Sequence, residues 1–109
     1  MGMAGISTHV LDSALGRPAA GIAVTLRLPD GSEHTDTTDV DGRITALHTG
    51  PVVAGVHRLT FAVAAYHAAT GQESFFPEIV LAFTPDPARG HHHVPLLLSP
   101  FAYTTYRGS

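Results

Sequence analysis

The sequence contains no cysteine and no lysine, and each absence excludes a class of chemistry. Without cysteine the chain has no disulfide, no thiolate zinc site and no cysteine nucleophile. All six cationic residues are arginines, which excludes a Schiff-base lysine and a lysine-rich patch for membrane surfaces.

Charge is also scarce, since only 14% of the 109 residues are charged. Part of the surface must therefore be uncharged or buried against another chain. The formal net charge of −3 argues against a partner such as nucleic acid, which is held through its phosphates.

Long apolar runs are missing too: none approaches the roughly 20 residues that a membrane-spanning helix needs. The first six residues lack the basic start and apolar stretch of a signal peptide. We therefore expect a soluble, cytoplasmic chain with no membrane partner. With 44% hydrophobic residues, residues 1–109 have enough apolar material for the core of a single domain.

Glycine and proline divide the chain into short segments, which is typical of an all-β sandwich. Apolar residues alternate with polar ones along two of these segments, as expected of half-buried strands. The predicted strands are 6–11, 22–28, 33–38, 43–44, 56–63, 78–84, 92–98 and 101–106, with a helix over 64–70. The polar segment 33–38 suits a sheet edge. Pro95 predicts an edge or bulge position for its strand, because it lacks the backbone N–H.

Eight histidines are present, and three of them are consecutive. On a strand, His91 and His93 would share one face while His92 points to the other. This pair, with His9 as a third ligand, could bind zinc; it could equally serve metal-free acid–base chemistry, or have no role in a solvated turn. The other four histidines are expected at the surface or at strand ends: His34, His48, His57 and His67.

Arg43 follows a predicted turn over 39–42, where its planar guanidinium could hold a carbonyl, a urea group or an anion. Ser74 could suggest hydrolysis by a Ser-His-Asp triad, but the Gly-x-Ser-x-Gly elbow is absent. The C-terminal segment 103–109 carries two tyrosines and an arginine, which a preceding strand could place at a defined position.

Five segments, in order, match a known pattern: 6–12, 41–43, 65–78, 93–100 and the terminal Tyr106-Arg107-Gly108-Ser109. Over essentially its whole length the chain thereby resembles the 5-hydroxyisourate hydrolases, the transthyretin-related proteins of urate breakdown. The terminal tetrapeptide is the most specific element, because transthyretin, the hormone carrier with the same fold, lacks it.

The resemblance implies a transthyretin-like β-sandwich of two four-stranded sheets with one short helix. It also implies a homotetramer built from two dimers, with active sites in the channel between the dimers. In this family each active site draws residues from two subunits, and no cofactor is expected.

The resemblance further implies the residues of the site. The implied catalytic residues are His9, Arg43, His93 and Ser109, and the implied substrate-binding residues are His91, Tyr106, Arg107 and Gly108. One departure is His92, where many relatives carry an aromatic residue. Because alternation turns this side chain away from His93, we expect little effect on chemistry, while an effect on packing or on metal binding stays open.

The implied reaction opens the cyclic amide of 5-hydroxyisourate to give 2-oxo-4-hydroxy-4-carboxy-5-ureidoimidazoline. We hypothesise that His9 and His93 share water activation and proton delivery without a metal, while Arg43 offsets charge on the attacked carbonyl. Three alternatives remain open: a zinc hydrolase using His9, His91 and His93; a transthyretin-like binder of a small aromatic ligand; and a structural β-sandwich adaptor.

Overall fold

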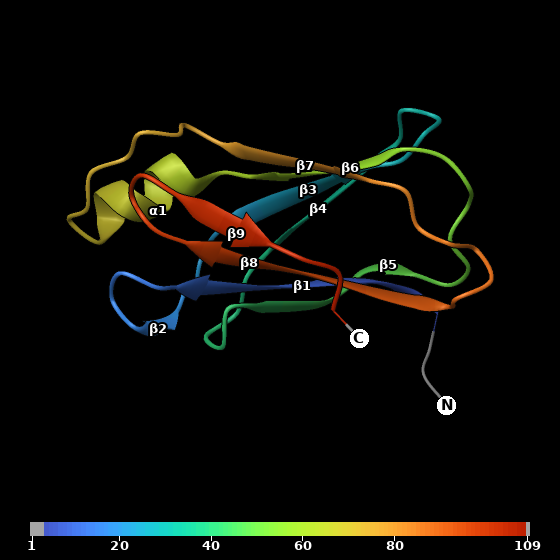
Figure 1. Cartoon of the computed structure of the whole chain (residues 1–109), viewed down its shortest axis with the longest axis horizontal. Helices are drawn as coiled ribbons and strands as arrows, with labels where there is room; N and C mark the ends of the chain where they lie inside the picture. The colour runs from blue at the N-terminus through green and yellow to red at the C-terminus, as the bar shows by residue number, and fades with distance from the viewer. Residues whose placement is uncertain (1–3, 109) are drawn as a thin grey trace.

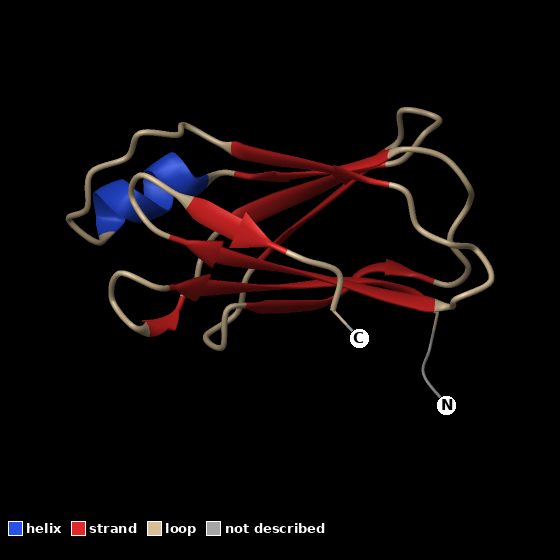
Figure 2. Ribbon diagram, in the orientation of Figure 1, coloured by secondary structure: helices blue, strands red, loops and turns tan. Residues whose placement is uncertain are grey.

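The architecture is two β-sheets packed face to face, with one short helix at an end of the sandwich (Figures 1 and 2). It is seen in a computed structural model that describes residues 4–108. This confirms the predicted transthyretin-like sandwich with one helix.

The first sheet is organised around β1 (Gly5–Asp12), which pairs in parallel with β8 (His91–Leu98). Two strands share the other side of β1: β5 (Arg43–Thr49) along its first half and β2 (Arg17–Pro18) at its end. The three-residue strand β9 (Tyr103–Thr105) pairs with the far side of β8. The sheet therefore contains five strands but is four strands wide.

The second sheet has the order β4-β3-β6-β7 and is antiparallel throughout. Its strands are β3 (Ala23–Arg27), β4 (Glu33–Thr37), β6 (His57–Phe61) and β7 (Ile79–Phe83). The polar strand β4 is fully exposed at the sheet edge, as its sequence predicts.

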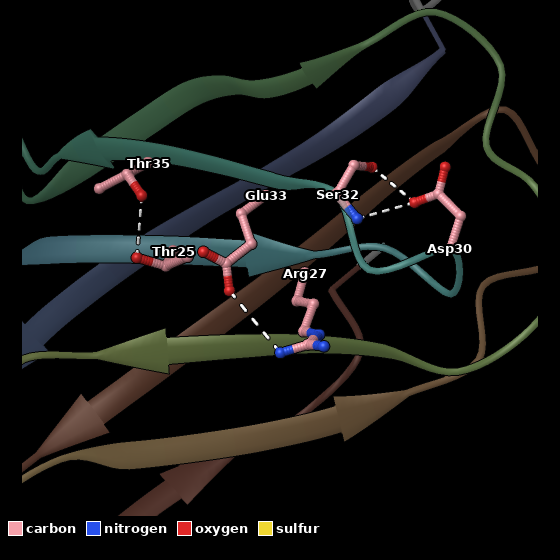
Figure 3. A network of polar contacts seen from close by, with 6 residues as sticks. All are labelled: Thr25, Arg27, Asp30, Ser32, Glu33 and Thr35. Atoms are coloured by element: carbon pink, nitrogen blue, oxygen red, sulfur yellow. Dashed lines mark hydrogen bonds and ion pairs between the residues drawn. The ribbon is translucent and has the colours of Figure 1, made fainter.

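Cross-strand pairs hold β4 in register on the solvent face of β3 (Figure 3). The hydroxyl groups of Thr25 and Thr35 lie 2.9 Å apart, and the Arg27 guanidinium lies 3.9 Å from a carboxylate oxygen of Glu33. Such exposed pairs each add little free energy, so they specify the register more than they stabilise the fold.

The core lies between the two sheets and is built by the period-2 alternation of their strands. Each inward apolar side chain contributes roughly 1.5–3 kcal/mol by leaving water. The apolar side chains with exposures of at most 1% are Ile6, Val10, Ala19, Ile22, Val24, Leu26, Leu59, Phe61, Val63, Ile79, Leu96 and Leu98.

The helix α1 (Val63–Ala69) follows β6 and covers one end of the core, within one residue of its predicted bounds. It is the only helix among residues 4–108, and its seven residues are far too few to cross a membrane. Its inward face presents Val63, Tyr66 and His67.

A buried polar contact joins this helix to β1. The Tyr66 hydroxyl donates to a carboxylate oxygen of Asp12 at 2.6 Å, and the Gln72 side-chain amide donates to the same oxygen at 2.9 Å. Burial raises the pKa of the Asp12 carboxyl, but these donors and the Leu15 backbone N–H more than compensate, so its pKa lies below the ordinary value. Burial and the neighbouring carboxylate raise the pKa of Tyr66 to about 12.

The edge position expected from Pro95 is wrong: β8 lies inside the sheet, between β1 and β9. Its side toward β1 is paired along its whole length. On the opposite side, the ladder with β9 covers only residues 96–98, and a separate bridge joins His93 to Gly108. The proline falls in the interval between them, where no N–H is required.

His57 and His67 are each only 1% exposed. His57 begins β6 and so lies at a strand end as expected, whereas His67 is buried on α1 and differs from the expectation. His57 points inward from β6, where its Nδ1 lies 3.1 Å from the carbonyl oxygen of Gly55 and its ring packs on Phe83. His67 faces the core from α1, with its Nδ1 3.2 Å from the Ser74 hydroxyl. Local hydrogen bonds let these two imidazoles occupy buried positions.

Replacing Tyr66 by phenylalanine should lower the free energy of unfolding by about 1–3 kcal/mol, because a buried carboxylate loses a donor. Urea unfolding at neutral pH measures this. The pKa of Asp12 is lower in the folded state than in the unfolded state. Asp12 therefore stabilises the fold above its unfolded-state pKa, and this stabilisation is lost as the pH falls through the folded-state pKa. Tyr66→Phe should weaken this dependence of the free energy of unfolding on acid pH. Tyr103→Phe, which removes a hydroxyl from an exposed side chain, is the control. Equal unfolding curves for the two variants would contradict the assignment.

Candidate active site between strands β1, β5 and β8

A hollow of about 290 Å³ opens where β1, β5 and β8 meet on the outward face of the first sheet. Strand register creates it, since Ser7 lies opposite His93 and His9 lies opposite Arg43. Three distant parts of the sequence thereby contribute to one surface. The lining residues are Ser7, Thr8, Arg43, Ile44, Thr45, His91 and His93.

A β-bulge in β5 lies at this hollow. Ile6 pairs with His48 and Thr8 with Ile44, so the three residues 45–47 lie opposite Ser7 alone. A bulge bends its strand and interrupts the ladder. Here the interruption lies beside the histidines, and Thr45 of the bulge lines the hollow.

Arg43 is positioned by the predicted turn over 39–42. The Asp39 carboxylate accepts the backbone N–H groups of Asp41 and Arg43, both at 2.9 Å. Gly42 has a φ of +74°, and a Cβ there would collide with the carbonyl oxygen of Val10. Only glycine fits this position, so the turn that precedes Arg43 has a defined shape.

His9 lies on β1 beside Arg43, with its Nε2 2.9 Å from the carbonyl oxygen of Asp41. A carbonyl only accepts hydrogen bonds, so Nε2 carries the proton. In the neutral ring, Nδ1 is then the nitrogen that can accept a proton.

His93 is half-buried at the floor of the hollow, with its Nδ1 2.8 Å from the Ser7 hydroxyl. Burial lowers the pKa of this imidazole, and the positive charges of Arg43, His9 and His91 lower it further. His93 is therefore neutral near pH 7, as a general base must be.

Ser7 is the residue that the sequence reasoning missed. Its hydroxyl lies 2.8 Å from His93 Nδ1 and also 2.8 Å from His91 Nε2. It stands two residues before His9 on the same strand, so alternation alone places it on the face of the histidines. That spacing was the available signal.

The C-terminal segment reaches the site through Gly108, whose backbone N–H donates to the carbonyl oxygen of His93 at 2.8 Å. A Cβ on Gly108 would lie 2.9 Å from the His93 ring, so only glycine packs here without displacing it. Tyr106 and Arg107 instead line a second hollow of about 320 Å³, together with His92 and Val94. Neither of them lines the hollow that contains His93, and Ser109 lies outside the described residues.

His92 points away from His93, as alternation predicts, and is buried. Its Nε2 accepts the backbone N–H of Asp86 at 3.0 Å, and burial lowers its pKa. His92 is therefore a buried imidazole whose neutral form is favoured. Within residues 4–108 no group of three or more metal-ligating side chains comes together, so the arrangement lends no support to a zinc site built from His9, His91 and His93.

Ser74 does contact a histidine, but the pair is not a catalytic dyad. The Ser74 hydroxyl donates to the carbonyl oxygen of Phe76 at 3.0 Å, so it accepts the Nδ1 proton of His67. A serine nucleophile must donate its proton to the histidine, which is the opposite arrangement.

Comparison with known protein families shows the family of the chain. Residues 6–108 match the family model of transthyretin, described as the HIUase/Transthyretin family. The chain belongs to the HIUase/Transthyretin family. The match includes every element of both sheets except the first residue of β1.

Both 5-hydroxyisourate hydrolases and transthyretins are among the proteins that this HIUase/Transthyretin chain is similar to. A 5-hydroxyisourate hydrolase of Deinococcus radiodurans is 41% identical, and the alignment covers 99% of this chain and 98% of the relative. The structure of Klebsiella pneumoniae 5-hydroxyisourate hydrolase matches with a TM-score of 0.86 and 36% identity, covering 95% and 98% of the two chains. Sea bream transthyretin in complex with thyroxine matches with a TM-score of 0.81 and 34% identity, covering 94% and 93%.

Replacing Arg43 by alanine should raise the pKa of His93, because a neighbouring positive charge that opposes protonation is removed. Histidine ring titration by NMR measures the shift. Arg27→Ala, which removes an exposed arginine from the second sheet, should leave the His93 titration unchanged. An unaltered midpoint in Arg43→Ala would show that Arg43 does not face His93.

Proposed function

We propose that this hydrolase opens the cyclic amide of 5-hydroxyisourate with water. The product would be 2-oxo-4-hydroxy-4-carboxy-5-ureidoimidazoline. The observation that carries the proposal is one hollow that combines a neutral histidine with an arginine. The identity of the proposed substrate comes from the curated 5-hydroxyisourate hydrolases that align with almost the whole chain.

In the proposed mechanism the Arg43 guanidinium holds the substrate's carbonyl and urea-like edges. It offsets the negative charge that develops on the carbonyl oxygen as water attacks. His93 and His9 act without a metal: one takes a proton from the attacking water and the other delivers a proton to the departing ring nitrogen. General acid–base catalysis of this kind contributes about 10²–10⁴ in rate.

The hollow opens outward, and we propose that a homotetramer, a dimer of dimers, closes it. Within one chain Tyr106 and Arg107 line a different hollow from His93, which fits a site that draws residues from two subunits. In the assembled tetramer we expect His91, Tyr106, Arg107 and Gly108 to contact the substrate and Ser109 to take part in catalysis. The single domain over residues 1–109 and the cytoplasmic location likewise stay predictions.

The protein should accelerate the ultraviolet decay of 5-hydroxyisourate generated from urate by urate oxidase. The acceleration should scale with protein concentration above the spontaneous decay, and chelators should leave it unchanged. Loss of the acceleration upon chelation would favour the zinc mechanism instead.

The second candidate function is binding of a small aromatic ligand, which is favoured by the structural match to a thyroxine-bound transthyretin. Spontaneous decay that is unchanged by the assembled protein would make this binder the better account. Thyroxine binding followed by calorimetry would then be the next measurement.

His9→Asn and His93→Asn should each lower kcat/KM at least about tenfold while the fold is retained, because each removes a proton-transfer group. His34→Asn is the matched control, since His34 is exposed on β4 in the second sheet. Wild-type activity in either variant would remove that histidine from the mechanism.

A further inference from the structure

Ser7 connects two imidazoles through a single hydroxyl group. Its oxygen lies 2.8 Å from Nε2 of His91 and 2.8 Å from Nδ1 of His93, two residues apart on β8. Ser7 itself is only 7% exposed, and the parallel pairing of β1 with β8 holds it in place. The contact therefore belongs to the sheet and not to a mobile loop.

A hydroxyl has one proton to donate, so the two histidines cannot choose their tautomers independently. If Ser7 donates to His91, then His93 must donate its Nδ1 proton to Ser7. Both neutral rings then carry their proton on Nδ1. In the reverse arrangement both rings carry it on Nε2.

We infer that Ser7 is a positioning residue that couples the protons of His91 and His93, so that a proton taken up by His93 leaves through His91. The inference rests on the proposed function and assigns to His93 the step in which a histidine takes a proton from the attacking water. It assigns Ser7 a role in the reaction. His91, which lines the hollow, becomes a proton-transfer partner of His93.

The proton count closes at each step. Both rings start with the proton on Nδ1, and His93 Nε2 takes a proton from water as the new C–O bond forms. The Nδ1 proton of His93 then moves to Ser7, the hydroxyl proton of Ser7 moves to His91 Nε2, and His91 releases its Nδ1 proton to solvent. When the ring C–N bond breaks, His9, protonated on both nitrogens, gives its Nδ1 proton to the departing nitrogen and regains one from solvent. His93 Nε2 then releases its proton to solvent, the relay runs backwards, and His91 takes up a proton at Nδ1.

The charges around His93 give this relay its driving force. An imidazolium at His93 would be half-buried and would face the positive charge of Arg43 and of any protonated His9. His91 is exposed, so water can stabilise a positive charge there. Moving the proton from His93 to His91 relieves the repulsion and returns His93 to its neutral form.

The kinetic test compares Ser7→Ala with Ser7→Thr. Ser7→Ala should lower kcat about tenfold or more while KM stays within about threefold, because proton transfer and not substrate binding is impaired. Ser7→Thr keeps the hydroxyl and should restore most of the wild-type kcat. Ser13→Ala removes a hydroxyl that bonds the Leu98 carbonyl at the other end of β1, and it should leave kcat unchanged.

Wild-type kcat in Ser7→Ala would overturn the inference, as would an equally low kcat in Ser7→Thr when that variant is folded. If the wild-type protein fails to hydrolyse 5-hydroxyisourate, the proposed function fails. The coupling of the two rings is still tested by a measurement that needs no substrate.

That measurement is the tautomeric state of the histidines, read from long-range ¹⁵N–¹H spectra of the wild-type protein at neutral pH. His91 and His93 should both be protonated on Nδ1, and in Ser7→Ala at least one ring should change its tautomer. One ring of each type in the wild type would contradict the coupling. Protonation of both rings on Nε2 would contradict the role of His93 as the base.

Discussion

The parallel pairing of β1 with β8 is the constraint on which the rest of the structure depends. It places Ser7 opposite His93 and Gly5 opposite His91, while the inward residues of the same strands form the centre of the core. Because side chains alternate with a period of two, a slip of one residue would move the histidines into the core and expose Ile6 and Val10. The free energy of core burial therefore also secures the geometry of the site.

The electrostatic character of the site follows from the same pairing. It brings His93 beside Arg43 and His9 in a half-buried position, where a charged imidazole is unfavourable and a neutral one is stable. Two backbone carbonyls position these histidines. The carbonyl of Asp41 accepts a hydrogen bond from His9 and fixes its tautomer, and the carbonyl of His93 accepts the backbone N–H of Gly108. Few charges are needed, which agrees with a sequence in which only 14% of residues are charged.

Glycine and proline positions together with alternation were sufficient to predict most strands. The polarity of residues 33–38 predicted the exposed edge strand β4, and alternation predicted the opposite orientations of His92 and His93. The sequence could not predict that β8 lies inside the sheet. A proline removes one backbone N–H, and tertiary structure leaves the β8–β9 ladder unpaired at that position. Sequence reasoning also missed the burial of His57 and His67, which depends on hydrogen bonds that form only after folding. Ser7 was overlooked because serine has no intrinsic signal for acid–base chemistry; its role depends on residues 84 and 86 positions away.

The contact between Gly108 and His93 has a consequence for the order in which the chain can fold during synthesis. The site combines residues from the first strand with a glycine at position 108, so it cannot form before position 108 has been synthesised. β1 itself must wait for its parallel partner β8, and such distant pairing is intrinsically slow to form. During synthesis β1 can pair early with β2 and β5, but its other edge stays unpaired until β8 has been made.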